Sequence, residues 1–245
     1  MNRLFLAGGL CLLFIFSGSN DLNGQKRWWA GNISGDGPVV EQTLDLSSFE
    51  KVSLGISADL YISQGSTQSV TIKGQQNIID NIIGTVENDT WRIRFDKPVR
   101  RSNELKIYIT VTKLSSVRVS GSGDVYGEGV FDQSNTFYTG ISGSGNMKLA
   151  VQAQEVVSKV SGSGNIALGG TAEDYEVQIS GSGNVKSEEL QAAHCNVRIS
   201  GSGSARVDVA DALEVRISGS GGVSYKGRPK ISSRISGSGN LRARD

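Results

Sequence analysis

One tetrapeptide, Ser-Gly-Ser-Gly, recurs seven times in the second half of this 245-residue chain. The copies lie 18 to 22 residues apart and start at Ser120, Ser142, Ser161, Ser180, Ser200, Ser218 and Ser236. A repeat period of about 20 residues is the signature of an architecture in which each unit stacks on the next. Glycine, at 32 residues, is enriched at these regular positions, so it indicates ordered turns and not a flexible linker.

The residues around each copy alternate between apolar and polar. A β-branched apolar residue stands directly before every copy, for example Val119, Ile141 and Ile199, and an apolar residue such as Val125 or Ile166 stands two positions after it. The residues between these positions are mostly polar or glycine. Alternation with a period of two residues is typical of a β-strand with one buried side. Each repeat is therefore predicted to form a strand, a glycine turn and a second strand.

A unit of this size cannot bury its own apolar side, so it must stack on its neighbours. Stacked coils place parallel strands about 4.8 Å apart. The sequence therefore predicts an all-β fold, a single-stranded right-handed parallel β-helix (β-solenoid) with rungs of 18 to 22 residues. The uneven rung length favours this form over a left-handed prism with a strict six-residue period. The last two spacings, both 18 residues, keep the left-handed form as an alternative.

The chain before Ser120 carries a weaker version of the same pattern. Short alternating stretches predict further strands, and they lie at 52–62, 69–74, 91–95 and 105–111. The glycine tetrapeptide is missing here and the connections are longer. We expect atypical rungs that continue the same stack.

These patterns predict the domain organisation. We expect residues 38–245 to form a single β-helical domain, with irregular rungs over 38–115 and regular rungs over 116–245. Residues 20–37, which contain Trp28 and Trp29, are expected to form an N-terminal segment or cap. A solenoid needs such a cover because an open end invites edge pairing.

Residues 1–19 have the pattern of a secretory signal peptide. Arg3 supplies the positive start, residues 4–16 form an apolar run, and the small residues at 17–19 provide a cleavage site. The run is short for a membrane span. We therefore predict an exported protein that resides in the periplasm, on the outer-membrane surface or outside the cell.

The composition argues against several classes of protein. Lys and Arg (25) nearly balance Asp and Glu (24), so no global field attracts nucleic acid. The sequence has no second apolar run of about 20 residues, so we expect no transmembrane helix in the exported chain. Cys11 lies in the signal and Cys195 is the other cysteine, so we expect no intramolecular disulfide in the exported chain.

Cationic residues stand two positions before five of the seven tetrapeptides. They are Arg118, Lys159, Arg198, Arg216 and Arg234. Because the neighbouring apolar residues face inward, these side chains should form an outward column with like charges one rung apart. Glu176 and Glu214, two residues earlier on the same face, are expected to neutralise part of it. The functional hypothesis is a strip for an acidic glycan or lipopolysaccharide, and the alternative is a solvated face that discourages edge pairing.

The residue after each tetrapeptide forms another recurring position. It is Asp124, Asn146, Asn165, Asn184, Ser204, Gly222 and Asn240. A calcium-binding repeat would need a carboxylate in every turn, and only the first of these residues supplies one. We therefore predict a hydrogen-bonded ladder of polar side chains and no metal site.

The remaining chemistry-bearing residues predict no catalytic centre. His194 and Cys195 are adjacent, but adjacent strand residues point to opposite sides, which separates a base from a nucleophile. The acidic residues look scattered among loops without a repeated column. The aromatic residues do not recur at the rung spacing, so they are expected to pack caps and loops and not to form a sugar-stacking platform.

Several segments resemble a known bacterial family, common in Bacteroidetes, that carries the auto-transporter adhesin head domain called the GIN domain. The likeness lies in residues 49–54 (Phe-Glu-Lys-Val-Ser-Leu), 62–65 (Ile-Ser-Gln-Gly) and 70–77 (Val-Thr-Ile-Lys-Gly-Gln-Gln-Asn), followed by the Ser-Gly-Ser-Gly-Asp/Asn rungs. It covers roughly residues 38–245. The resemblance implies a β-helical fold at or near the cell surface with an adhesive role, and it implies no catalytic residues.

Taken together, these patterns predict a non-catalytic exported binding or adhesion module of the cell envelope without a cofactor. Its expected partner is a polysaccharide or surface glycan, or another envelope protein. A self-associating structural module is the first alternative, and it would form oligomers. A polysaccharide-active enzyme is the second, and it would require a cluster of carboxylates in a surface groove.

Overall fold

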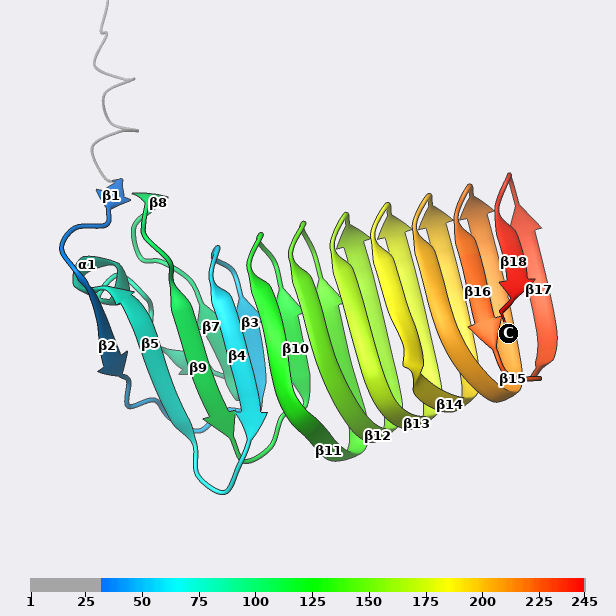
Figure 1. Ribbon diagram of the computed structural model, residues 1–245, viewed down its shortest axis with the longest axis horizontal. Coiled ribbons are helices and arrows are strands. Elements are labelled where there is room, and N and C mark those ends of the chain that lie inside the picture. The colour runs from blue at the N-terminus through cyan, green and yellow to red at the C-terminus, as the bar shows by residue number, and fades with distance from the viewer. Residues whose placement is uncertain (1–31, 245) are drawn as a thin grey trace, which may run out of the picture. The chain divides into compact units, whose positions relative to one another are not determined.

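The strands of this chain stack in parallel along one axis in the computed structural model, which describes residues 32–244 (Figure 1). Strands make up 69% of the structure and form a β-solenoid of about seven turns. The regular coils comprise β10 (Ser116–Val119), β11 (Asp124–Ile141), β12 (Asn146–Gly162), β13 (Asn165–Gly181), β14 (Asn184–Gly201), β15 (Ser204–Gly219), β16 (Gly222–Lys226), β17 (Lys230–Ser236) and β18 (Asn240–Ala243). The predicted all-β solenoid is confirmed.

Each regular coil has two long faces. The strand half that follows a tetrapeptide, for example residues 124–131, descends on the near side of Figure 1, and we call this side the descending face. The half that precedes the next tetrapeptide, for example residues 136–141, rises on the far side, and we call it the ascending face. Since the chain advances toward its C-terminus during this motion, the winding is right-handed, as predicted.

The glycines of the tetrapeptide close the coil where no side chain fits. Gly181, the first glycine of its tetrapeptide, has a φ of 125°, a region that L-residues with a side chain rarely adopt. A Cβ there would lie 2.7 Å from the carbonyl oxygen of Gly162 in the preceding rung. At the last position of another turn, a Cβ on Gly221 would lie 2.6 Å from Cγ2 of Ile199. Glycine therefore recurs in every tetrapeptide because successive rungs approach too closely at this corner for a side chain.

A row of polar side chains runs from rung to rung beside the turns. Asn146 donates its amide to Asp124 at 2.9 Å, Asn165 donates to Asn146 at 2.9 Å, and Asn184 donates to Asn165 at 2.9 Å. Ser204 ends this series by donating its hydroxyl to Asn184 at 2.6 Å. The predicted hydrogen-bonded ladder is confirmed, and it ties five successive rungs together.

The core holds one buried chain of hydroxyl groups among aliphatic columns. The Tyr175 hydroxyl donates to Ser158 Oγ at 3.2 Å and lies 2.9 Å from Ser187 Oγ. Thr139 Oγ1 lies 2.9 Å from Ser158 Oγ, and Ser187 donates to the carbonyl of Arg206 at 3.1 Å. Burial raises the pKa of Tyr175, and these hydrogen bonds oppose that shift in part. The network joins the two faces through groups that each have a partner, as buried polar groups require.

The N-terminal half contains the predicted rungs, but the rungs are stacked out of chain order. Its elements are β1 (Ile33–Ser34), β2 (Val39–Thr43), β3 (Lys51–Leu54), β4 (Asp59–Gln64), β5 (Ser69–Gln75), α1 (Gln76–Ile79), β6 (Val86–Glu87), β7 (Thr90–Ile93), β8 (Val99–Arg101) and β9 (Lys106–Val111). The coil of β3 and β4 lies between two others, because β3 pairs with β7 and β10, and β4 pairs with β9 and β11. The later rung of β7 and β9 is therefore nearer the N-terminal end of the solenoid.

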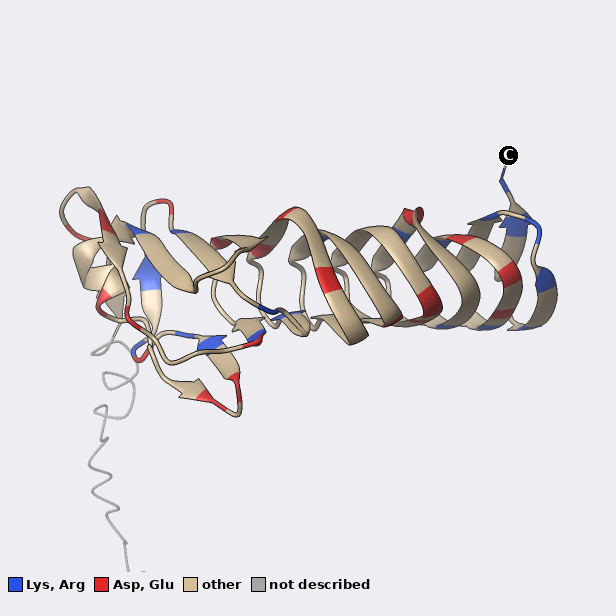
Figure 2. Ribbon diagram, turned by 90° about the horizontal axis from the view of Figure 1, so that it is seen from below, with Lys and Arg blue, Asp and Glu red and all other residues tan. Residues whose placement is uncertain are grey.

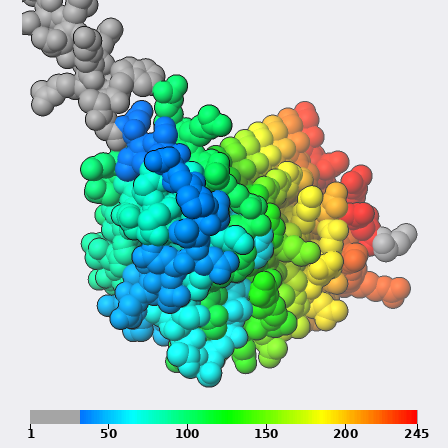
Figure 3. Space-filling model, turned by 60° about the vertical axis from the view of Figure 1, so that its left-hand side comes forward, coloured from blue at the N-terminus to red at the C-terminus, as the bar shows by residue number. Residues whose placement is uncertain are grey.

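Antiparallel strands cover this end, where Figure 3 shows the blue and cyan residues of the N-terminal part of the chain gathered. β5 pairs with β9 and β2 pairs with β5, both antiparallel, and β6 pairs with β7 in the same sense. The predicted cap at 20–37 is described only from residue 32 onward, and Trp28, Trp29, Cys11 and the signal at 1–19 lie outside the described residues. Within residues 32–244, no helix is long or apolar enough to cross a bilayer.

Candidate functional site

The predicted cationic residues form one column on the ascending face. Strand pairing aligns them one per rung, in the order Arg118, Gly140, Lys159, Gln178, Arg198, Arg216 and Arg234. We call this set the basic column. The pairing extends it at its N-terminal end through Ser53 to Arg92, a cation that the tetrapeptide spacing does not indicate. Arg92 joins the column because its rung is displaced from chain order.

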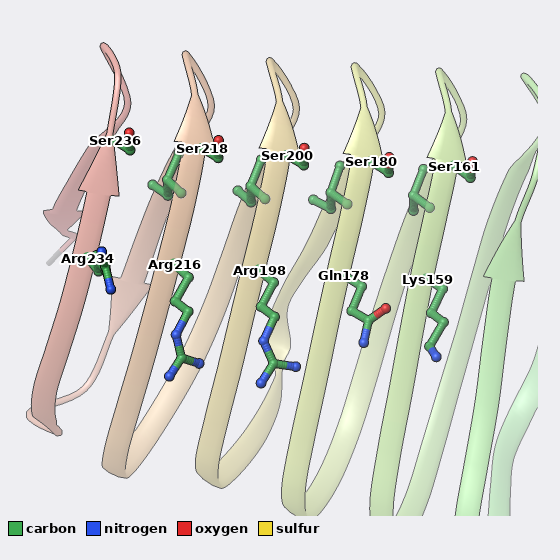
Figure 4. A pocket seen from close by; sticks show the side chains of 14 residues that line it. Lys159, Ser161, Gln178, Ser180, Arg198, Ser200, Arg216, Ser218, Arg234 and Ser236 are labelled. Atoms are coloured by element: carbon green, nitrogen blue, oxygen red, sulfur yellow. The ribbon is translucent and has the colours of Figure 1, made fainter.

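A groove with a volume of about 670 Å³ follows the C-terminal part of the basic column (Figure 4). One row is formed by Lys159, Gln178, Arg198, Arg216 and Arg234. A second row is formed by the first serines of the turns, Ser161, Ser180, Ser200, Ser218 and Ser236. The aliphatic residues that stand between the two rows in the sequence, Val160, Ile179, Ile199 and Ile217, also line the groove. Arg118 is not part of this groove. It lines a separate hollow of about 300 Å³ with Arg92 and Lys51.

Two carboxylates hold two of the arginines of the groove. Arg198 Nη1 lies 3.0 Å from Glu176 Oε1, and Arg216 forms an ion pair with Glu214. The predicted partial neutralisation by these two glutamates is confirmed. Both arginine side chains are about half exposed, at 46% and 49%, so each pair stabilises the fold little and serves mainly to orient the guanidinium.

The rest of the basic column is uncompensated. Among the described residues, Arg118, Lys159 and Arg234 make no ion pair. Gln178 donates its amide to Glu176 at 2.6 Å, so this rung interrupts the cations with a neutral side chain. The groove therefore combines a row of mostly cationic side chains and a row of hydroxyl groups with an aliphatic lining between them in the sequence.

The acidic residues are less scattered than the sequence indicates. Strand pairing places Glu155, Asp174 and His194 in one outward column, and these residues line a hollow of about 590 Å³ with Glu176 and Glu214. Figure 2, a view from below, shows acidic residues along the bends of these coils. The interpretation of the acids as isolated loop charges is wrong for this set, because strand register brings loop-flanking positions of different rungs together.

Each acidic residue of this hollow faces a partner. Glu155 accepts a hydrogen bond from Thr136 at 2.8 Å, and Asp174 Oδ1 lies 3.3 Å from His194 Nδ1. Glu176 and Glu214 hold the arginines of the groove. The hollow thus adjoins the basic column, and two of its carboxylates, Glu176 and Glu214, orient Arg198 and Arg216.

His194 and Cys195 point to opposite sides of β14, as predicted. The His194 side chain is half exposed, whereas Cys195 is 4% exposed and lies in the core column between Tyr175 and Leu213. Burial raises the pKa of the Cys195 thiol, which disfavours the thiolate that would act as a nucleophile. The pair does not form a nucleophile and base.

We expect Cys195 to resist alkylation in the folded protein. Iodoacetamide should label the Cys195 peptide only under denaturing conditions, because the buried thiol is neither exposed nor ionised. Mass spectrometry of the peptide, with and without denaturant, measures this directly. Rapid labelling of the native protein that depends on His194 would contradict the assignment.

Three tyrosines stack on the descending face, which corrects the expectation that the aromatic residues do not align. The rings of Tyr61 and Tyr108 lie 5.1 Å apart at 14°, and those of Tyr61 and Tyr126 lie 5.3 Å apart at 24°. The alignment is invisible in the sequence because the rung of β9 is displaced from chain order. Since the ring faces cover one another, the stack presents mainly edges and hydroxyls, and a sugar ring would need an open face.

Comparison with known proteins identifies relatives of this fold. A family model described as "Putative auto-transporter adhesin, head GIN domain" matches residues 48–229. Among curated proteins, none matches the chain.

Solved structures share the architecture. A putative adhesin from Bacteroides fragilis is 25% identical, covers 87% of this chain and 100% of its own, and has a TM-score of 0.81. A putative lipid binding protein from Parabacteroides distasonis is 23% identical with a TM-score of 0.71 and the same coverage, 87% and 100%. A putative adhesin from Parabacteroides merdae is 19% identical, covers 88% and 100%, and has a TM-score of 0.68.

Proposed function

Since the chain belongs to the family of the putative auto-transporter adhesin head GIN domain, we propose that it is a non-catalytic binding or adhesion module of the cell envelope that recognises an acidic polysaccharide. The family and the relative from Bacteroides fragilis are of adhesin type by name, which supports the adhesive role. The observation that carries the ligand class is the alignment of the basic column along a groove that a parallel row of serines also lines.

The shape of the groove suits an extended polymer. It crosses five rungs and is open to solvent along its length, so a ligand can lie in it as a chain and make one modest contact per rung. Charge contacts at exposed sites are individually weak and are screened by salt. Several of them in a row give useful affinity when they act on one polymer, because later contacts form at a high effective concentration.

The carboxylate hollow beside the groove is the feature that an enzyme would need, and its contacts favour a supporting role. A general acid or base must reach the substrate with a free proton or lone pair. Here Glu176 and Glu214 are engaged by the arginines that line the groove, and Asp174 faces His194. We expect no cleavage of a bound uronate polymer, measured as unsaturated or reducing ends released during incubation with the protein.

We expect saturable binding to polygalacturonate and none to dextran, a neutral polymer. Calorimetric titration at low and moderate salt measures this, and affinity should fall as salt rises. Substituting Arg198, Arg216 and Arg234 together with glutamate should weaken binding by at least about tenfold, because it reverses three adjacent cations of the groove.

A matched control lies on the opposite face. Lys148, Lys186 and Arg242 occupy the outward column of the descending face, and their joint substitution with glutamate changes the net charge by the same amount. Binding should persist in this control. An equal loss in both triple variants would reduce the effect to net charge, and absence of binding to polygalacturonate and to hyaluronan, a second acidic polymer, would overturn the proposal.

A further inference from the structure

The positive charges of the groove repeat at the separation of neighbouring strands. Arg198, Arg216 and Arg234 are direct partners in parallel strand pairs, with no register shift at these positions. Neighbouring strands lie about 4.8 Å apart, so three cations follow one another at that interval along the solenoid axis. A ligand that ran along a strand, across this direction, would meet only one of them.

The hydroxyl row of the groove has the same repeat. Ser200, Ser218 and Ser236 are also direct partners across successive rungs. Each of these three rungs therefore offers one cation and, nearer the turn on the same strand, one hydroxyl (Figure 4). One sugar ring with its linking oxygen is about as long as this step, so consecutive sugars of an extended chain can meet consecutive rungs.

The column is interrupted at one rung. Gln178 stands between Lys159 and Arg198, and its amide is directed to Glu176. The C-terminal run of three arginines is thus the longest unbroken run of cations in the groove. A ligand with an anion on every sugar would match this run, whereas one with an anion on alternate sugars would leave a guanidinium without a partner.

Like charges at this separation repel one another, and the structure compensates them only in part. Glu176 and Glu214 are paired with two of the arginines, but Arg234 has no carboxylate partner among the described residues. A row of carboxylates in the groove would relieve this repulsion at each rung. This gain depends on the spacing of the charges along the ligand and not only on their number.

We propose that the groove reads charge spacing: its ligand is a linear polysaccharide with one carboxylate on every sugar, lying along the solenoid axis with one sugar per rung. This inference rests on the proposed function and names the ligand class of the same site. The three arginines bind three consecutive carboxylates, and the rung of Gln178 is a neutral step before Lys159.

Oligosaccharides of defined length test the spacing. Oligogalacturonates, from the dimer to the octamer, carry a carboxylate on every sugar, and hyaluronan oligosaccharides carry one on alternate sugars. In calorimetric titrations at equal salt, oligogalacturonate affinity should rise sharply from dimer to trimer and level off once five rungs are occupied. At equal numbers of carboxylates, the hyaluronan oligosaccharides should bind at least about tenfold more weakly.

A gain-of-function variant makes the test sharper. Gln178→Arg removes the neutral step, so it should tighten binding of the pentamer several-fold and leave binding of the trimer nearly unchanged, because the trimer already occupies the three arginines. Ala167→Arg adds the same charge to the same strand, β13, on the descending face and is the matched control. Its pentamer affinity should equal that of the parent protein.

The outcomes separate the two proposals. Equal binding of both polymers at equal carboxylate number, or a Gln178→Arg effect that is the same for trimer and pentamer, would overturn the spacing and leave acidic polysaccharide binding intact. Absence of binding to both polymers would overturn both. A length dependence with the preference described above supports the inference.

Discussion

Replacing Gly181 with alanine should lower the free energy of unfolding by at least about 3 kcal/mol. Two costs combine at this position. The φ of 125° lies in a region that a residue with a Cβ avoids, and the added Cβ would lie 2.7 Å from the carbonyl oxygen of Gly162. The atom it meets is backbone in the neighbouring rung, so no flexible side chain can move aside. Urea denaturation followed by circular dichroism measures the change.

Gly129 provides the control for this prediction. Its φ is 82°, and a Cβ there would have no atom within 4 Å, so Gly129→Ala carries the backbone cost without the contact. We expect a loss of about 1 kcal/mol. If the two alanine variants were equally stable, the close approach of successive turns would not be what makes glycine necessary in the tetrapeptide.

Trp91→Ala should destabilise the protein by about 3 to 5 kcal/mol. The indole is fully buried in β7, its N–H donates to the carbonyl of Ile83 at 3.1 Å, and its ring centroid lies 5.8 Å from that of Phe49. Truncation opens a cavity beneath the antiparallel cover of the N-terminal end and leaves that carbonyl without its donor. Thermal and urea unfolding of the variant measure the loss.

The conservative change at the same position separates the two effects. Trp91→Phe keeps an aromatic ring next to Phe49 but loses the hydrogen bond, so its loss of stability should be clearly smaller than that of Trp91→Ala. If the antiparallel strands at the N-terminal end unfolded independently of the regular coils, the unfolding curve would show two transitions. This is possible because each repeat of a solenoid contacts mainly its neighbours. A loss below about 1 kcal/mol for Trp91→Ala would show that this end contributes little.

The basic column shows how far spacing arguments reach in a repeat protein. Lys159, Arg198, Arg216 and Arg234 each stand two residues before a tetrapeptide, so their alignment on the stacked rungs follows from counting residues. Their depth in a groove and their carboxylate partners do not follow from counting. Those features depend on how the strands on the ascending face are bent and on side chains from two different columns.

The sequence by itself determined the solenoid, the inward and outward positions of the regular rungs, and the opposite orientations of His194 and Cys195, whereas it favoured right-handed coils without deciding the hand. The period of two within strands and the glycine turn at each corner are local signals, and stacking repeats them in the same phase. Only the tertiary structure decided the order of the N-terminal rungs, where β3 and β4 lie between the coil of β7 and β9 and the coil of β10 and β11.

Because the N-terminal rungs are stacked out of chain order, Arg92 extends the basic column and Tyr61 stacks between Tyr108 and Tyr126. No spacing along the chain announces these contacts, because the partners are consecutive in the stack but not in the sequence. Which rung covers which is settled by the fit of buried surfaces such as that around Trp91, and by the antiparallel strands that cover the open edge. Those are properties of the assembled core.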